Sequence, residues 1–268
     1  MLDQLPIGLL RTTEQTLGCT LAYCAFEPIT GLLSSHRAHE VTETASTYKL
    51  PLLLYIAHQV DVGELRWSQP LTLEHRHRSW GTGILKDLST GLTLPLQDVC
   101  RLMVVLSDNT ATDILATHCD LEAVNKQLGD WGFQKTRLLA QLTPPHPQGR
   151  PPLLMGQTTP AEMVRLLCGV LDASFVSAAS SQFILDLLGA QQDRSMIPRL
   201  LPQGWHYAGK TGSNADLRAD VDIVRDPMGR QVVLALYGQH PASDDWSVDS
   251  VGTLALAQLA QAILLPMG

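Results

Sequence analysis

Three short groups of polar residues have types and an order that suit nucleophilic catalysis. They are Ser46-Thr47-Tyr48-Lys49, Ser107-Asp108-Asn109 and Lys210-Thr211-Gly212-Ser213. A serine hydroxyl becomes a nucleophile when a base takes its proton, and a desolvated lysine loses its own proton more easily and can act as that base. Each group alone is a weak signal, because a serine often caps a helix and a lysine often lies on the surface. All three together predict a site with a nucleophilic serine.

The element that positions the first group is a predicted helix over residues 46–60. Its apolar residues recur at three- and four-residue steps, which is the pattern of a largely buried helix: Leu50, Leu53, Leu54, Ala57 and Val60. Pro51 is tolerated only near the start of a helix, so the helix is expected to begin near Ser46. A helix N-terminus favours negative charge developing beside Ser46. Lys49 follows three residues later, on the same face.

The remaining pattern places strands at both ends of the chain and helices between them. Residues 2–16 are typical of an amphipathic helix, and 17–26 with 32–37 of a β-hairpin. Further helices are predicted at 95–106, 111–118, 121–128, 160–171, 177–190 and 247–265, and strands at 205–211, 219–225 and 231–238. This indicates an α/β fold (α+β layers), with an antiparallel sheet flanked by helices from both chain ends and an inserted all-helical domain. The expected domains are 1–45 with 191–268, and 46–190, with the active site in the cleft between them.

Composition excludes several classes of function. With 268 residues, a net charge of −7 and a pI of about 5.7, non-specific binding to nucleic acid is not expected. No run of 18 apolar residues predicts a membrane span. The N-terminus lacks the features of a signal peptide, which indicates a cytoplasmic protein, or a periplasmic or secreted one whose N-terminus was trimmed. The five cysteines show no tight pattern, so we expect free thiols and no metal site or cofactor. The expected partner is a small-molecule substrate, and the expected state a monomer.

The three polar groups together resemble the class A β-lactamase family, within the penicillin-recognising serine hydrolases. The resemblance covers most of the chain and includes several further segments: Glu27–Gly31, Gly81-Thr82-Gly83-Ile84-Leu85, Thr158-Thr159-Pro160, Gln191–Arg194, Leu200–Trp205 and Val221–Val224. Several of them look closest to the less-studied class-A-like hydrolases and penicillin-binding proteins, and less like the efficient clinical enzymes. The resemblance implies a β-lactamase/transpeptidase-like fold.

Residue chemistry and the resemblance together suggest a role for each catalytic candidate. Ser46 is expected to accept the acyl group, Lys49 to take its proton, and Ser107 to relay a proton to the leaving nitrogen. Lys210 holds Ser107 electrostatically and adds positive potential for an anionic substrate. The resemblance implies that the backbone N–H groups of Ser46 and Ser213 form the oxyanion hole.

A second set of residues is expected to bind the substrate. The Thr211-Gly212-Ser213 segment offers hydroxyls for a substrate carboxylate, and Asn109 offers both a donor and an acceptor for an acyl-amide side chain. Arg218 is expected either to supply a second cation for that carboxylate or to form an ordinary strand salt bridge. Trp80 either lines the cleft or packs as a surface aromatic residue. Asp108 is expected to brace its turn and not to react.

The loop before the Thr-Thr-Pro helix departs from the family pattern. Efficient class A enzymes carry a deacylating Glu and a nearby Asn there, yet no Asp or Glu occurs between Asp130 and Glu162. An ungapped count puts Thr143 and Pro147 at those two positions. The expected loop, 138–157, is rich in proline. Its His146 is read either as a substitute base or as a solvent-exposed histidine.

The family's loop-bracing ion pair and its helical-domain disulfide are missing as well. Gln141 and Gly156 fall near the positions of the ion pair, and Leu53 stands opposite Cys100 where the disulfide would need a second cysteine. Unpaired thiols fit either a reducing compartment or simple divergence.

Three functions remain open on this basis. The leading interpretation is a hydrolase that opens β-lactams through an acyl-enzyme on Ser46, with slow deacylation because the loop Glu is missing. The second is a D-alanyl peptidase or esterase. The third is a penicillin-binding protein that is acylated without turnover. Chromogenic cephalosporin turnover distinguishes the first from the third.

Overall fold

The computed structural model describes residues 7–140, 155–239 and 245–265. The chain forms two compact units. One contains residues 1–47, 158–168 and 193–268, and the other contains 48–157 and 169–192. The division differs from the expected domains mainly at 158–168, which belongs with the sheet. It adds the start of helix α6 (Pro160–Leu171) to the sheet unit, because that part of α6 packs on the sheet.

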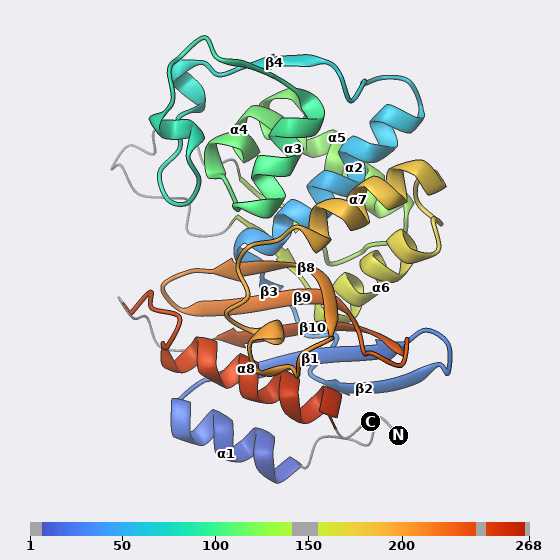
Figure 1. Ribbon diagram of the computed structural model, residues 1–268, viewed down its shortest axis with the longest axis vertical. Helices are drawn as coiled ribbons and strands as arrows, with labels where there is room; N and C mark the ends of the chain where they lie inside the picture. Colours follow the sequence, from blue (N-terminus) through green and yellow to red (C-terminus); the bar gives the residue numbers. More distant parts are fainter. Residues whose placement is uncertain (1–6, 141–154, 240–244, 266–268) are drawn as a thin grey trace. The chain divides into compact units, whose positions relative to one another are not determined.

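The first unit is built on a five-stranded antiparallel sheet with strand order β2-β1-β10-β9-β8. Its strands are β1 (Thr20–Glu27), β2 (Leu32–His36), β8 (His206–Ser213), β9 (Leu217–Arg225) and β10 (Gln231–Gln239). Two helices from opposite ends of the chain, α1 (Ile7–Leu17) and α8 (Val251–Leu264), lie on one face of the sheet (Figure 1). This confirms the predicted sheet with flanking terminal helices.

Alternating residues of the central strands build the core beneath α8. Val224, Leu234 and Leu236 point to the same side and pack with Leu256 and Leu259 of the helix. The 3₁₀ turn η4 (Ile197–Leu200) joins this layer through Ile197. Burial of so many branched side chains on one face fixes the strand register, since a slip by one residue would turn every one of them to the other face.

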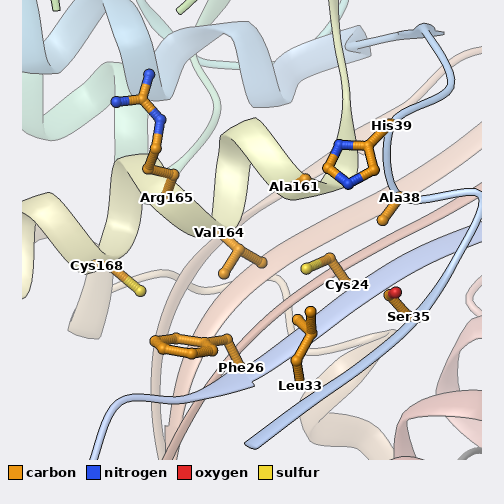
Figure 2. Close-up of a pocket in the computed structure, with 10 residues that line it drawn as sticks. All are labelled: Cys24, Phe26, Leu33, Ser35, Ala38, His39, Ala161, Val164, Arg165 and Cys168. Atoms are coloured by element: carbon orange, nitrogen blue, oxygen red, sulfur yellow. The ribbon is translucent and has the colours of Figure 1, made fainter. Parts of the chain in front are cut away.

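A hollow of about 260 Å³ lies elsewhere in the same unit, between α6 and the β1–β2 hairpin (Figure 2). Cys24 and Phe26 of β1, Leu33 of β2, and Val164 and Cys168 of α6 contribute to its largely apolar lining. None of the residues predicted to do chemistry lines it. The hollow is therefore distinct from the candidate active site.

The second unit is mainly helical. Its helices are α2 (Lys49–Asp61), α3 (Leu96–Val105), α4 (Asn109–His118), α5 (Leu121–Asp130) and α7 (Ala178–Gly189). Helix α2 is its centre, with Leu52, Leu53 and Ile56 inaccessible to solvent. Its last residue, Asp61, accepts hydrogen bonds from the backbone and hydroxyl of Ser177 at the start of α7. The predicted central buried helix is thus present.

Several short elements were not expected from the sequence. They are the strand pair β4 (Pro70–Thr72) and β5 (Thr93–Pro95), the pair β6 (Arg137–Leu138) and β7 (Gly156–Thr158), and the 3₁₀ turns η2 (His75–His77) and η3 (Leu85–Asp87), and all but Thr158 belong to the second unit. The inserted domain is therefore not wholly helical. These pieces are too short for a periodic pattern to identify them.

Other local predictions can be compared directly with the structure. The cap at Thr159 is present, because its hydroxyl oxygen accepts the N–H of Glu162 at 3.2 Å. No disulfide joins any two of the five cysteines. Loop positions 141, 143, 146 and 147 lie outside the described residues. Among the described helices, none combines the length and apolar character needed to cross a membrane.

Candidate active site

Ser46 lies just before the central helix, in a tighter turn than predicted. The 3₁₀ turn η1 (Ala45–Tyr48) precedes α2, which begins at Lys49 and not at Ser46. Ala45 has φ of +41°, in the left-handed region that non-glycine residues rarely occupy. Pro51 is then the third residue of α2, where its missing N–H costs no intrahelical bond. The strained residue before Ser46 marks this turn as one held by its surroundings.

The end of β8 approaches this turn so closely that only glycine fits there. A Cβ atom on Gly212 would lie 2.9 Å from the carbonyl oxygen of Thr44, 3.0 Å from the nitrogen of Ser46 and 3.1 Å from that of Thr47. The first two distances are shorter than ordinary carbon contacts. The backbone nitrogen of Ser46 therefore lies beside the strand that ends at Ser213. An oxyanion hole formed by the N–H groups of these two residues stays a prediction.

Lys210 stands on β8, two residues before Gly212, and is inaccessible to solvent. Its amino group donates to the carbonyl oxygen of Thr211 at 2.8 Å. Burial lowers the pKa of Lys210 to about 8, and this effect is partly opposed by Asp193, Asp220 and Asp222. Lys210 therefore releases its proton at a lower pH than an exposed lysine does.

Two of those carboxyls, Asp220 and Asp222, were missed by the sequence reasoning. They alternate on β9 and are 1% and 3% exposed. Burial raises the pKa of Asp220, although its carboxylate accepts the backbone N–H of Ile197 at 2.9 Å. The available sequence signal was two acidic residues alternating with the apolar residues Val221 and Ile223, because carboxylates are rarely buried without a reason.

Arg218, on β9, directs its guanidinium to the backbone. It donates to the carbonyl oxygens of Asn214 at 2.5 Å, Leu217 at 3.0 Å and Asp245 at 2.9 Å. The guanidinium also lies 5.3 Å from the centre of the Trp246 ring, a cation–π distance. Arg218 thus ties the turn after Ser213 to residues 245–246, and its role toward a substrate carboxylate stays a prediction.

In the second unit, the predicted catalytic residues Lys49 and Ser107 are in direct contact. The Lys49 amino group donates to the Ser107 carbonyl oxygen at 2.8 Å, to the Ser107 hydroxyl at 2.9 Å and to Asn109 Oδ1 at 2.9 Å. Lys49 itself is fully buried. Ser107 has φ of +53°, so it is a second residue with a strained backbone, and this one is itself predicted to be catalytic.

The hydrogen-bond partners of Lys49 suit both the charged and the neutral form of its amine. The Ser107 carbonyl and Asn109 Oδ1 can only accept, so they use two donors of the amine. The orientation of Asn109 is set because its Nδ2 donates to the Trp80 carbonyl at 2.9 Å. The third partner, the Ser107 hydroxyl, can accept from an ammonium or donate to a neutral amine. Both protonation states of Lys49 are therefore accommodated without rearrangement.

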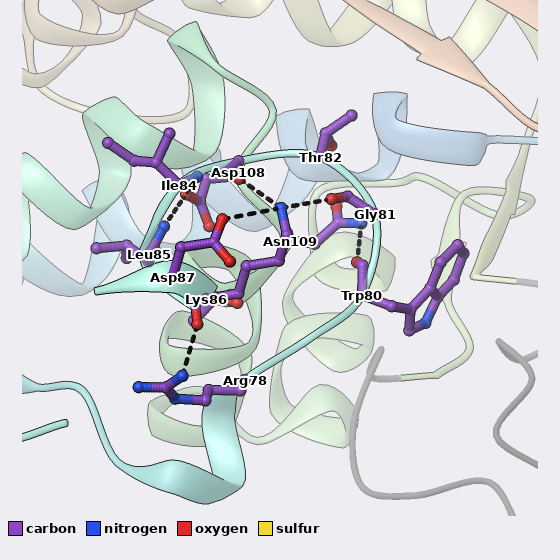
Figure 3. A network of polar contacts seen from close by, with 12 residues as sticks. Arg78, Trp80, Gly81, Thr82, Ile84, Leu85, Lys86, Asp87, Asp108 and Asn109 are labelled. Atoms are coloured by element: carbon purple, nitrogen blue, oxygen red, sulfur yellow. Dashed lines mark hydrogen bonds and ion pairs between the residues drawn. The ribbon is translucent and has the colours of Figure 1, made fainter. Parts of the chain in front are cut away.

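Asp108 braces this turn, as expected. Its Oδ1 accepts the N–H of Ala111 at 2.9 Å and caps α4, while Oδ2 accepts the N–H groups of Ile84 at 2.7 Å and Leu85 at 2.9 Å (Figure 3). Gly83 packs against it, and a Cβ there would lie 2.2 Å from the Asp108 carboxyl carbon. The glycine-rich segment 81–85 thus supports the turn that holds Ser107 and Asn109.

Trp80 contributes its backbone to this network, while its ring is half exposed. Figure 3 shows the ring directed away from the Asp108 carboxyl, and whether it contacts substrate stays a prediction. Thr82, which was noted only as part of the glycine-rich segment, donates its hydroxyl to the Ser107 carbonyl at 2.7 Å. The main contribution of this segment is therefore made by backbone and hydroxyl groups around Ser107.

Comparisons with known proteins identify the family of the chain and its fold. The model of the β-lactamase enzyme family matches residues 18–264. A β-lactamase from Sphaerobacter thermophilus has 27% identity and a TM-score of 0.86, with 98% of this chain and 96% of that one covered. PBP-A has 22% identity and a TM-score of 0.85, with 98% and 96% covered. A class A β-lactamase from Mycobacterium abscessus shares the fold at 18% identity and a TM-score of 0.87, with 99% and 100% covered. The chain belongs to the β-lactamase enzyme family and is a serine hydrolase of that type, which acts on β-lactams.

Proposed function

We propose that this enzyme opens β-lactams through an acyl-enzyme on Ser46 and that deacylation limits its turnover. The hydrogen-bond set of Lys49 is the observation that carries the proposal. An amine that contacts a serine hydroxyl and is held by two obligate acceptors is prepared to receive and release a proton.

The proposed reaction begins when the Ser46 hydroxyl attacks the lactam carbonyl and Lys49 takes the hydroxyl proton. The N–H groups of Ser46 and Ser213 stabilise the developing oxyanion. The C–N bond of the ring then breaks, and the proton passes from Lys49 through the Ser107 hydroxyl to the leaving nitrogen. The products of this step are an ester on Ser46 and a free amine in the opened ring. Asn109, Thr211 and Lys210 hold the acyl amide and the carboxylate of the substrate.

Water must then attack the Ser46 ester, and this step needs a base on the face opposite the leaving group. The stretch between Asp130 and Glu162 provides no carboxylate for it. Slow deacylation follows, and acyl-enzyme accumulates. A mutant of the structurally similar PBP-A is known as an acyl-enzyme complex with penicillin G, at 22% identity and a TM-score of 0.84.

The structural match to PBP-A, which covers 98% of this chain, supports a penicillin-binding protein as the second candidate function. An acyl-enzyme that forms on Ser46 and is not hydrolysed would make this protein a penicillin-binding protein without turnover. A D-alanyl peptidase or esterase would use the same Ser46 nucleophile on an open-chain substrate. The catalytic residues are common to all three functions, so deacylation and substrate preference decide between them.

Burst kinetics test the proposal. Mixing enzyme with nitrocefin in a stopped-flow instrument should give a burst near one equivalent of enzyme, followed by a slow steady state. Mass spectrometry of the quenched enzyme should show the adduct on the peptide that contains Ser46. A fast linear trace without an adduct would refute slow deacylation. An adduct that persists for hours would instead indicate the penicillin-binding function, and turnover of a D-alanyl peptide alone would indicate the peptidase.

A further inference from the structure

Glu43 is a carboxyl group close to the proposed oxyanion hole that none of the motifs includes. It is the second residue of the short strand β3 (Thr42–Glu43), three residues before Ser46. Its side chain is partly buried, and its Oε1 accepts a hydrogen bond from Asn214 Nδ2 at 2.5 Å. Asn214 directly follows Ser213. One side chain therefore links the segment that leads to Ser46 with the segment that leaves Ser213.

Asn214 forms hydrogen bonds through both its side chain and its backbone. Glu43 accepts from its side-chain amide, Arg218 donates to its carbonyl oxygen at 2.5 Å, and its own N–H donates to Leu217 at 2.9 Å. Two residues earlier, Gly212 meets the turn that contains Ser46. The two chain segments are thus fastened to each other on either side of Ser213. Any shift of Asn214 would displace the Ser213 N–H relative to that of Ser46.

The surroundings of Glu43 favour the neutral form of its carboxyl more than water does. Burial, followed by the nearby Asp216 carboxylate, raises the pKa of Glu43 to about 7, and the bond from Asn214 acts in the opposite direction. Two cations of strands β8 and β9 are engaged elsewhere. Arg218 donates to three backbone carbonyls with Asp245 beside it, and Lys210 donates to the Thr211 carbonyl. Within the described residues, no salt bridge to Glu43 offsets Asp216.

We propose that Glu43 is a positioning residue that supports the oxyanion hole through Asn214 and that opposes acylation when it ionises. The neutral carboxyl and the carboxylate both accept from Asn214, so the support exists in either state. The carboxylate, however, adds a negative charge beside the place where the oxyanion develops. A like charge there destabilises the transition state and repels a carboxylate-bearing substrate. Glu43 thereby makes reactivity toward anionic substrates depend on pH. The inference rests on the proposed acyl-enzyme function.

The test compares acylation rate constants of the wild type and Glu43→Gln from pH 5.5 to 8.5, with nitrocefin in single-turnover stopped flow. Glutamine still accepts from Asn214 but cannot ionise. The ratio of wild type to variant should fall about tenfold as pH rises through 7, and taking the ratio removes titrations shared by both proteins, including that of Lys210. Glu43→Ala should be slower than Glu43→Gln at every pH, because neither variant can ionise and only in the alanine variant does Asn214 lose its acceptor. Glu40→Gln, an exposed glutamate on the same segment, is the matched control and should behave as the wild type.

A ratio that does not change with pH would overturn the proposed charge effect, and a Glu43→Ala variant as fast as Glu43→Gln would overturn the positioning role. Carbon-13 NMR of labelled glutamate, assigned with the Gln variant, measures the titration of Glu43 without any substrate. A midpoint below pH 5 would also overturn the inference. If the wild type forms no adduct on Ser46, the proposed function fails instead, while the NMR midpoint still tests whether Glu43 is neutral near pH 6. Near-UV circular dichroism confirms that both Glu43 variants fold.

Discussion

The amino group of Lys49 and the hydroxyl group of Ser107 are 2.9 Å apart, and the same amine lies 2.8 Å from the Ser107 carbonyl oxygen. Two contacts with one residue fix the position of the amine, which also lies 2.9 Å from Asn109 Oδ1. A buried lysine with three polar partners avoids the cost of an unpaired buried charge. The Lys49 amine and the Ser107 hydroxyl can therefore exchange a proton directly, so a substitution that changes the charge state of Lys49 should change the rate of acylation.

Replacing Ser46 by alanine should abolish covalent labelling by a fluorescent penicillin without unfolding the protein. Ser46 is partly exposed and lies in the 3₁₀ turn before α2, so loss of its hydroxyl removes the nucleophile but little packing. Gel fluorescence measures the labelling and circular dichroism the fold. Ser35→Ala, at an exposed serine of β2, is the matched control and should label normally. Labelling of Ser46→Ala at the wild-type level would assign the nucleophile to another residue.

Replacing Asn109 by aspartate should slow acylation at pH 7 by about 10- to 100-fold. A carboxylate in place of Oδ1, 2.9 Å from Lys49 Nζ, favours the ammonium form and removes the base. The rate should recover in more alkaline solution, so the pH profile of single-turnover acylation shifts upward. Thr82→Val, which removes only a donor to the Ser107 carbonyl, should leave the profile in place. An unshifted profile for Asn109→Asp would contradict a neutral Lys49 as the base.

Replacing Lys210 by alanine should raise the activation free energy of acylation by about 2–4 kcal/mol for carboxylate-bearing substrates. The increase should be far smaller for a neutral ester. The reason is the loss of one buried cation. In the wild type, the ammonium fraction falls as pH rises through about 8, so kcat/KM for the anionic substrate should fall above that pH. The measurement is kcat/KM for both substrates from pH 6 to 9.5. Equal losses on the two substrates would show that the charge does not act on the carboxylate.

Replacing Asp108 by alanine should lower the free energy of unfolding by about 2–4 kcal/mol, because three backbone N–H groups lose their acceptor. Asp108→Asn should cost less, since its single carbonyl oxygen can still serve either Ala111 or the Ile84–Leu85 pair. Urea unfolding followed by circular dichroism provides the values. Asp98→Asn, at a carboxylate in the first turn of α3, is a comparison with a helix-dipole contribution only. If Asp108→Ala were as stable as wild type, the brace would be energetically unimportant.

The sequence by itself determined the central helix, the three polar groups and the family. Residues 49–61 are helical because their apolar side chains recur with the helical period, and Thr159 caps α6 because its hydroxyl reaches an N–H three residues away. These features depend on neighbours within a few positions. A pattern in a single chain records such neighbours directly.

Only the tertiary structure decided which side chains meet across the chain. Glu43 and Asn214 are 171 positions apart, and their contact exists because Gly212 lets β8 pass close to the turn at Ser46. The guanidinium of Arg218 likewise donates to three backbone carbonyls, because the turn after Ser213 and the segment at Asp245 bring those carbonyls to it. No periodicity encodes such contacts, because the packing of distant elements and the burial of their charges determine them together.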